Sequence, residues 1–494
     1  MNSSKITKIE YVDVIIVGGG IAGIATAEFL ARHSNLSIKL LDKASHLGTE
    51  SSGKLEGWYH TGALYSGQDD AQTFINCVNG VEDLINFYTP YFTSQCNVEL
   101  LEKKAGFFTP SVIPKLGGWF DNSPVYLIHP QVDSPEIHFS RLKSDLIHIN
   151  NQKERVLGRL EAAYGEQHNW LIDNKCIAPT YAQVENNEKI ESSLQQSTTT
   201  IRNICNQFNL SYGIKTNGYG YIKTLDCSMN TNKILKDLVS SSLNHGVNFE
   251  TGITIEKLSM DNYGPVRLKS LLCKTKEGLS KKFKARLFIF AVGNGFEPFL
   301  RDLQIRARLK CNKSAMVVAV PPLTDVNFFR MSTKNNFHFN HFLRRSDPNS
   351  HAYSILANSG YINNETSDEI NTDPILELAE RYFGDKNLYS RELYSYECAK
   401  TEFVSEEEQK RRYSYWIESK PNSNYICILP GKFSFFPTVA YQTYQRVKTL
   451  LDFQEINPRL QFQSTNDLEI KTNGLVANSF SFQISENSYL YNIK

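Results

Sequence analysis

A glycine-rich turn between an apolar strand and a helix is the most constraining feature of the sequence. Tyr11–Val17 is short, apolar and rich in β-branched residues, which is typical of a buried parallel strand. It runs into Gly18–Gly23 (GGGIAG), and residues 24–32 predict a helix. A second predicted strand, 37–41, ends at Asp42, about 20 residues after the last glycine. This spacing predicts a dinucleotide-binding βαβ unit.

Each position of the turn has a physical role in binding a dinucleotide. Gly18 permits the tight turn, Gly20 leaves room for a pyrophosphate to approach the backbone, and Gly23 lets the helix lie close to the strand. Ile21 and Ala22 lie in the turn just before the predicted helix, whose N-terminal N–H groups and positive dipole end favour phosphate. We therefore expect all five residues to contact the cofactor.

The acid that follows the second strand is the expected ligand of the adenosine ribose. Asp42 has the spacing of a residue that accepts hydrogen bonds from ribose hydroxyls, and its neighbour Lys43 is also an expected cofactor contact. The turn and the acid together do not separate FAD from NAD. The choice between them depends on the rest of the chain.

Composition excludes several other classes of protein. The 494 residues carry 53 Lys+Arg against 52 Asp+Glu, so no overall charge attracts nucleic acid. Nine cysteines form no CxxC pair, and we expect free thiols in a reducing compartment and no metal site. The first residues contain no apolar run of a secretory signal, and 12–31 holds two acids and four glycines, unlike a membrane span. We therefore expect a cytoplasmic protein.

Residues 51–62 carry a resemblance to a known family. Ser51–Leu55 (SSGKL) and Trp58–Gly62 (WYHTG) resemble elements of the D-amino-acid-oxidase-type superfamily of FAD-dependent oxidoreductases, nearest its glycerol-3-phosphate and L-2-hydroxyglutarate dehydrogenase branches. This chain has additional residues between Lys-Leu and the histidine, so the match is approximate. The resemblance implies FAD as the cofactor, with contacts from this segment at Ser51, Ser52, Lys54 and Gly62.

Three later segments of the sequence also resemble elements of this superfamily, and they occur in the same order along the chain. They are 225–258, 285–295 and 426–447. The resemblance implies that Ile255 contacts the adenine and that small residues at Ala291 and Gly293 let the backbone approach the cofactor. It also implies a turn at the flavin's pyrimidine edge, formed by Gly431, Lys432 and Ser434.

The same order implies a fold assembled from non-contiguous segments. We expect an α/β fold, with a Rossmann-type FAD-binding domain and a β-rich domain that caps the substrate. The expected FAD domain comprises 10–95, 215–300 and 395–450, the cap comprises 96–214 and 301–394, and 451–494 is a C-terminal extension. Local patterns predict helices at 231–244 and from about Pro437, and strands at 255–258, 287–292, 315–320, 337–343, 352–356 and 426–429.

His60 is the candidate catalytic residue. An alcohol oxidised by flavin must lose its hydroxyl proton to a base, and histidine titrates near neutral pH. Two other roles for His60 stay open: it holds FAD, covalently or by a hydrogen bond, or it only packs in the core. Arg344, Arg345 and Lys400 are candidate anchors of an anionic substrate, and solvent-exposed positions explain each of them equally well.

The expected reaction is hydride transfer to FAD from a C–H bond beside a hydroxyl of a small polar, anionic substrate. Oxidation of a C–N bond in an amine or amino acid is the alternative, because Trp58-x-His60-x-Gly62 also resembles the dimethylglycine and sarcosine dehydrogenase branch. A third alternative is a non-catalytic binding protein like the GDP-dissociation inhibitors. We expect oxygen or a quinone as the electron acceptor, no nucleic-acid partner, and peripheral membrane contact as an option.

Overall fold

The computed structural model describes the chain in segments that form two compact units. It describes 8–60, isolated positions between 73 and 88, 119–120, 125–129, 220–224, 226–261, 267–324, 327–330, 339–344, 352–363, 371–404, 415–456, 466–476 and 491–492. Unit 1 comprises Met1–Lys54, Thr231–Asn312 and Ala399–Asn478. Unit 2 comprises Leu55–Asn230, Lys313–Cys398 and Ser479–Lys494.

Unit 1 is built on a mixed sheet with the strand order β16-β17-β10-β1-β2-β7. Strands β17, β10, β1, β2 and β7 are parallel, whereas β16 pairs antiparallel with β17, and β9 pairs antiparallel with β10 and β8. The strands are β1 Lys8–Val17, β2 Ile38–Leu41, β7 Asn248–Glu250, β8 Ile253–Met260, β9 Leu268–Thr275, β10 Ser280–Phe290, β16 Trp416–Glu418 and β17 Tyr425–Leu429.

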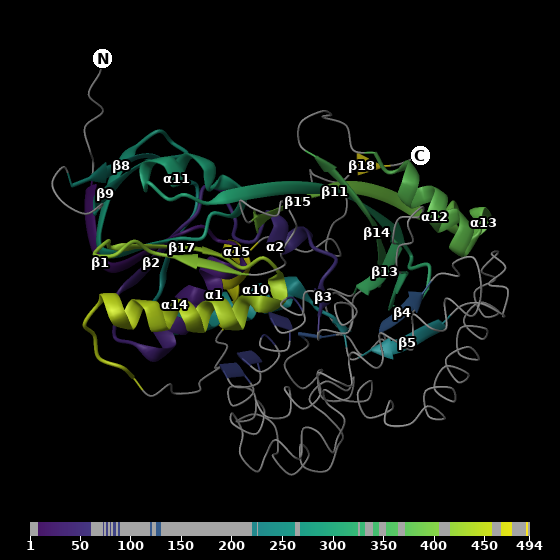
Figure 1. The fold of residues 1–494 in the computed structure, drawn as a ribbon, viewed down its shortest axis with the longest axis horizontal. Helices are drawn as coiled ribbons and strands as arrows, with labels where there is room; N and C mark the ends of the chain where they lie inside the picture. The colour runs from purple at the N-terminus through teal and green to yellow at the C-terminus, as the bar shows by residue number, and fades with distance from the viewer. Residues whose placement is uncertain are drawn as a thin grey trace, which may run out of the picture. The chain divides into compact units, whose positions relative to one another are not determined.

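Helices α1 and α14 pack against this sheet, and α10 packs against α1 (Figure 1). The helices of unit 1 are α1 Ile21–His33, α2 Ser51–Lys54, α10 Thr231–Asn244, α11 Glu297–Asp302, α14 Phe436–Leu450 and α15 Asn466–Leu475, with 3-10 turns η3 Gly293–Gly295 and η4 Phe433–Phe435. Every residue of α1 before His33 is buried, because helices cover it as well as the sheet. Strands β2 and β17 are buried along their whole length.

The predicted elements of unit 1 are present with adjusted bounds. Helix α10 spans the predicted 231–244, and α14 begins at Phe436, one residue before the expected proline. Strand β1 starts at Lys8 rather than Tyr11, because its first residues pair with Lys281–Phe283 of β10. Strand β8 extends past both ends of the predicted 255–258, and β10 begins well before the predicted 287–292, since a β-ladder continues beyond the apolar residues that the pattern detects. Strand β10 ends at Phe290, before the predicted end at 292.

The carboxylate of Asp13 links β1 to the residue before β2 and to β10. It accepts hydrogen bonds from the Ser37 backbone N–H at 2.9 Å, the Ser37 hydroxyl at 2.6 Å and Arg286 Nη1 at 3.1 Å. Burial opposes its ionisation, but these donors outweigh burial and lower the pKa of Asp13. A lowered pKa stabilises the fold above the carboxyl's unfolded pKa, and this contribution is lost as the pH falls through the folded one.

Asp13→Asn is therefore expected to reduce the free energy of unfolding at neutral pH, by less than about 1 kcal/mol because the site is partly solvated. The difference in the free energy of unfolding between variant and wild type should vanish in acid, because the protonated carboxyl of the wild type is then uncharged, like the amide of the variant. Urea unfolding at a series of pH values measures this. A difference that persists in acid would contradict the assignment to charge.

Unit 2 contains an eight-stranded sheet with the order β18-β15-β11-β14-β13-β12-β4-β5. Its strands are β4 Val125–His129, β5 Gly220–Thr224, β11 Arg308–Val320, β12 Asn327–Arg330, β13 Phe339–Arg344, β14 Tyr353–Asn363, β15 Glu392–Val404 and β18 Tyr491–Asn492. A separate two-stranded ribbon joins β3 Trp58–Tyr59 to β6 Cys227–Ser228. The predicted strands 315–320, 337–343 and 352–356 lie within or overlap β11, β13 and β14.

Strand β13 is buried along its whole length, because the sheet is covered on both faces there. One face packs with α12 Asp373–Phe383 and α13 Asp385–Leu388 into a core that includes Phe339 and Leu356. The other face forms a second core with Phe342, Phe329 and Trp58. The ribbon residue Trp58 therefore packs against the strand that ends in Arg344.

The division of the chain differs in its bounds from the expected domains. The first segment of unit 1 ends at Lys54, well before the expected 95. The expected extension, 451–494, is instead shared between the units. Residues up to Asn478 belong to unit 1, because Ser34 bridges to Glu455 and Leu47 bridges to Val476. The cofactor-binding and substrate-capping roles assigned to these segments stay predictions.

No helix within the described segments has both the length and the apolar character needed to cross a bilayer.

Candidate functional site

Three main-chain segments meet closely at the start of α1. A Cβ on Gly18, whose φ is +111°, would overlap the carbonyl oxygen of Ala291. A Cβ on Gly23 would overlap the carbonyl oxygen of Gly18 and lie 3.4 Å from the Ala291 Cβ. The Ala291 N–H donates to Val17 O at 2.7 Å. Gly18, Gly23 and Ala291 are thus required for β1, α1 and β10 to approach one another, in agreement with their small size.

Gly20 differs from these two glycines, because the protein itself leaves space beside it. A Cβ there would have only Ser52 Oγ nearby, at 3.2 Å. Gly20 is the N-cap residue of α1 and has no side chain with which to cap the helix. The Ile21 N–H donates to Ser52 Oγ at 2.9 Å, so Ser52 satisfies one amide of the first turn. The space and the N-terminus of α1, whose N-cap residue offers no side-chain acceptor, fit a pyrophosphate.

Asp42 is held by main-chain donors on both of its carboxylate oxygens. Oδ2 accepts the Gly19 N–H at 2.5 Å, and Oδ1 accepts the Ala44 N–H at 2.7 Å. Burial raises the pKa of Asp42, although these hydrogen bonds oppose the rise. Each oxygen retains a lone pair, so the carboxylate can also accept a ribose hydroxyl. Its neighbour Lys43 has an exposed side chain.

The segment after Asp42 folds back under the glycine turn. The Gly48 N–H donates to Gly19 O at 2.9 Å, and a Cβ on Gly48, at φ +74°, would lie 2.7 Å from Leu235 Cδ1. In the following helix α2, Ser51 Oγ donates to Ala399 O, and Ser52 is buried. Lys54 closes α2 and is half-buried. Sequence reasoning missed Gly48, whose only local signal is a glycine just before the serines.

The start of β8 lies beside Asp42. The Ile253 N–H donates to Asp42 O at 2.8 Å, and the Gly252 N–H donates to Ala44 O at 2.7 Å. Ile255, two residues further along β8, is partly buried against the core of unit 1. Its contact with adenine stays a prediction.

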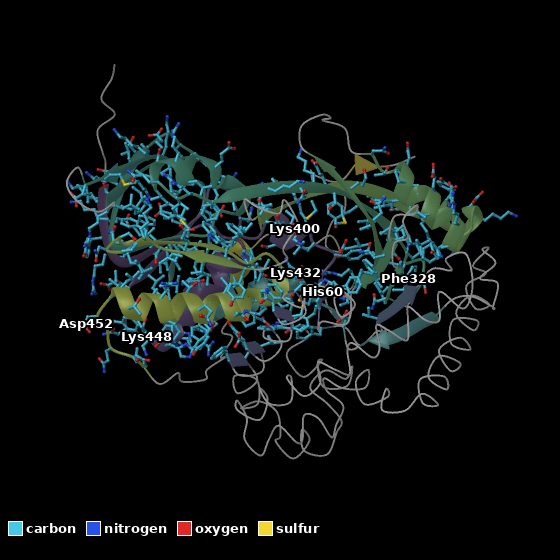
Figure 2. All side chains as sticks on the ribbon, in the orientation of Figure 1. His60, Phe328, Lys400, Lys432, Lys448 and Asp452 are labelled. Atoms are coloured by element: carbon cyan, nitrogen blue, oxygen red, sulfur yellow. The ribbon has the colours of Figure 1, made fainter. Side chains whose placement is uncertain are left out.

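A second turn in unit 1 leads from β17 into α14. Gly431 has φ +65°, and the Lys432 N–H donates back to Pro430 O at 2.6 Å. Lys432 is buried, and Figure 2 labels it. Ser434 is 2% exposed, and its Oγ makes no hydrogen bond to the residues that the structure describes. A buried hydroxyl without a partner fits a site completed by a polar ligand.

Ser434→Ala is expected to leave the stability of the apoprotein unchanged or slightly higher, because the hydroxyl gains nothing there. If the flavin completes the site, the same change should weaken FAD binding by about 1 kcal/mol, the value of one hydrogen bond. Thermal unfolding without FAD and titration of the apoprotein with FAD measure the two effects. An unchanged dissociation constant would remove Ser434 from the cofactor site.

The structure gathers the predicted residues in two places within unit 1. Around the start of α1 it brings together Gly18, Gly20, Ile21, Ala22, Gly23, Asp42, Ser52 and Ala291. Gly293, with φ +52°, opens η3 two residues after Ala291, and Gly431, Lys432 and Ser434 form the second turn. Gly62 lies outside the described residues. Within the described ranges, no three His, Cys, Asp or Glu side chains gather as metal ligands would.

His60 belongs to unit 2 and is held there by an aromatic stack. The residue is 9% exposed, and its ring lies 4.7 Å from the Trp58 ring at an interplanar angle of 22°. Trp58 Nε1–H donates to Asp226 Oδ2 at 3.0 Å. Figure 2 labels His60. Burial and stacking hold the imidazole in one orientation, and its catalytic role stays a prediction.

Comparison with known families decides between the cofactors. The profile of the family described as FAD dependent oxidoreductase (DAO) matches residues 13–399, which is most of the chain. The chain belongs to this family. The resemblance noted from the sequence, the Rossmann-type fold with FAD as cofactor, and the assignment to the oxidoreductases are thereby confirmed. Binding as a GDP-dissociation inhibitor is not supported.

Among curated proteins, the similarity to the DAO family is local. A mitochondrial L-2-hydroxyglutarate dehydrogenase of Nematostella vectensis is 45% identical over 58 residues, which are 12% of this chain and 13% of that protein. Proteins of the same name from other organisms also match. The chain thus matches less than a fifth of the length of these relatives.

Solved structures of the DAO family share the fold over nearly the whole chain. An L-α-glycerophosphate oxidase from Mycoplasma pneumoniae, solved with FAD bound, has a TM-score of 0.57 at 15% identity, covering 92% of this chain and 98% of its own. An L-proline dehydrogenase from P. horikoshii has a TM-score of 0.56 at 12% identity, covering 95% and 100%. At these identities the likeness establishes the fold alone.

Proposed function

We propose that the protein oxidises a C–H bond beside a hydroxyl of a small polar, anionic substrate, with FAD as the hydride acceptor. The observation that carries this proposal is the local identity to L-2-hydroxyglutarate dehydrogenases, in a chain that belongs to the FAD-dependent family. The relatives' name supplies the substrate class, a hydroxy acid.

The cofactor would occupy unit 1. The space beside Gly20 and the N-terminus of α1 would receive the pyrophosphate, and Asp42 would accept hydrogen bonds from the ribose hydroxyls. Lys432 and Ser434 would lie at the flavin ring, where the N-terminus of α14 favours negative charge. Bound FAD supplies the electron sink for the hydride that leaves the substrate carbon.

His60 would take the hydroxyl proton onto an imidazole nitrogen. The proton must leave as the C–O bond gains double-bond character, and a histidine is partly unprotonated near neutral pH. The stack on Trp58 would keep the imidazole in one orientation for this transfer. An amine substrate needs no such base, because the neutral amine already carries a free electron pair.

Anaerobic reduction of the flavin tests the proposal. The holoprotein is mixed with L-2-hydroxyglutarate, L-glycerol 3-phosphate, glycine and L-proline in turn, and loss of the ~450 nm flavin band is followed. We expect bleaching by a hydroxy compound and none by the amino acids. Bleaching by glycine or proline alone would replace the proposal with C–N oxidation, which the Trp58-x-His60-x-Gly62 element and the fold shared with L-proline dehydrogenase support.

We further propose that the reduced flavin passes its electrons to oxygen or a quinone. An oxygen electrode and a soluble quinone analogue, used with the substrate that bleaches the flavin, distinguish these acceptors. If neither accepts electrons while the flavin stays reduced, this part of the proposal fails.

A further inference from the structure

Arg344 is a buried arginine whose guanidinium holds two main-chain carbonyls of unit 2. It ends β13 and is 6% exposed. Its Nη1 donates to Glu56 O at 3.0 Å and to Met229 O at 2.5 Å. The Tyr353 hydroxyl also contacts this guanidinium. Arg344 thus joins two segments that are far from it in the sequence.

Gly57 is required for the guanidinium to reach these carbonyls. It has φ +79°, and a Cβ there would overlap Arg344 Nη1 and lie 2.5 Å from Met229 O. The Gly57 O also accepts the Met229 N–H at 2.5 Å. The main chain at 56–57, the main chain at 229 and the guanidinium therefore form one closed, buried network, which we call the Arg344 clasp.

The residues next to the Arg344 clasp carry His60. Trp58 and Tyr59 pair with Ser228 and Cys227 in the β3–β6 ribbon. Ser228 Oγ donates to Leu343 O at 3.3 Å, which ties the ribbon to β13 a second time.

Strand β13 also contacts the Trp58 ring on which His60 stacks. The Trp58 ring lies 4.9 Å from Phe342 of β13 and 4.7 Å from the His60 ring. The orientation of the imidazole therefore depends on a ribbon that β13 holds through Arg344 and Leu343.

We propose that Arg344 is a positioning residue, which fixes the Trp58–His60 stack through the carbonyls of Glu56 and Met229. The proposal rests on the role of His60 in the proposed function. Lysine does not replace arginine here, because its single ammonium nitrogen cannot both take the position of Nη1 beside the two carbonyls and present the rest of a planar guanidinium to the Tyr353 hydroxyl. The geometry assigns Nη1 to the main chain rather than to a substrate anion.

Two changes open the Arg344 clasp from opposite sides. Arg344→Lys removes the planar guanidinium, and Gly57→Ala places a methyl group where Nη1 lies. Gly246→Ala is the matched control, since Gly246 has a similar φ of +85° and a Cβ there meets nothing within 4 Å. Ser228→Ala is a milder variant, which removes only the bond to Leu343.

The readouts are FAD content, the rate and KM of substrate-dependent flavin reduction, and hydrogen exchange of the 226–230 peptide. We expect Arg344→Lys and Gly57→Ala to retain FAD, to lower the reduction rate by about 10- to 100-fold with little change in KM, and to speed exchange at Met229. Ser228→Ala should show a smaller fall, and Gly246→Ala should match the wild type.

Other results would overturn the positioning role. A large rise in KM at an unchanged maximal rate would make Arg344 a substrate anchor. Faster exchange with unchanged kinetics would make the Arg344 clasp purely structural, provided that a His60→Gln variant is slow. If the flavin of the His60→Gln variant is itself reduced at the wild-type rate, the proposed catalytic role of His60 is wrong, and the positioning role of Arg344 falls with it.

Discussion

Gly20→Val is expected to give a folded protein that no longer retains FAD. Gly20 has φ −81° and ψ 179°, a conformation that valine adopts readily, and the new Cβ would have only Ser52 Oγ nearby. The apoprotein should therefore unfold within about 0.5 kcal/mol of the wild type. The methyl groups would occupy the space that the pyrophosphate requires.

The expected loss of affinity is large. Excluding the phosphate from two backbone donors removes charge-assisted hydrogen bonds worth about 3 kcal/mol together, which corresponds to about a 100-fold higher dissociation constant. The absorption spectrum of the purified protein and titration of the apoprotein with FAD measure it. Full FAD occupancy in this variant would refute the assignment of the turn to the pyrophosphate.

Two other glycines provide the controls. Gly474→Ala lies in α15, where the added Cβ meets nothing within 4 Å, and it should bind FAD normally. Gly23→Ala would push its Cβ into the carbonyl oxygen of Gly18, so it should destabilise the fold itself by about 2 kcal/mol. The contrast separates loss of the ligand from loss of the fold.

His60→Gln is expected to slow flavin reduction by about 100- to 10,000-fold, the usual contribution of a general base. Glutamine has a planar amide of similar size that can lie against Trp58, so the ribbon and FAD content should be preserved. In the wild type the rate should rise with pH as the His60 imidazole loses its proton, and in the variant this rise should be absent. Stopped-flow reduction at several pH values measures both effects.

The control is His245→Gln, since His245 lies just after α10 in unit 1, where its Nδ1 is 2.8 Å from Ser241 O. Substrate should reduce the flavin of the His245→Gln variant at the wild-type rate. Acid precipitation tests the remaining role of His60: free flavin in the supernatant is expected, whereas flavin in the pellet would indicate covalent attachment. Reduction of the His60 variant at an unchanged rate would remove His60 from the chemistry.

The residues expected to bind the pyrophosphate and the ribose could be predicted well from the sequence, because they are close together along the chain. Gly18, Gly20, Gly23 and Asp42 lie within one βαβ unit, and the turn and the helix start constrain them locally. The hydrogen-bond partners of Asp42, which are the N–H groups of Gly19 and Ala44, could be identified only in the three-dimensional structure. The same holds for the difference between Gly20, which has open space beside it, and Gly23, which packs against main chain.

The sequence by itself determined a dinucleotide-binding βαβ unit, since the spacing of glycines and apolar residues encodes a strand, a turn and a helix directly. The family and FAD followed from the resemblance of residues 51–62 and the three later blocks, which the family match confirmed. Only the tertiary structure decided how His60 is held. Arg344 reaches Glu56 and Met229 across long stretches of chain, and no local pattern marks such a contact. Gly57 looks like an ordinary turn glycine until the guanidinium is seen to fill the space where its Cβ would lie. Contacts between distant segments depend on how strands pair, and the pairing of β3 with β6 exists only after the chain has folded.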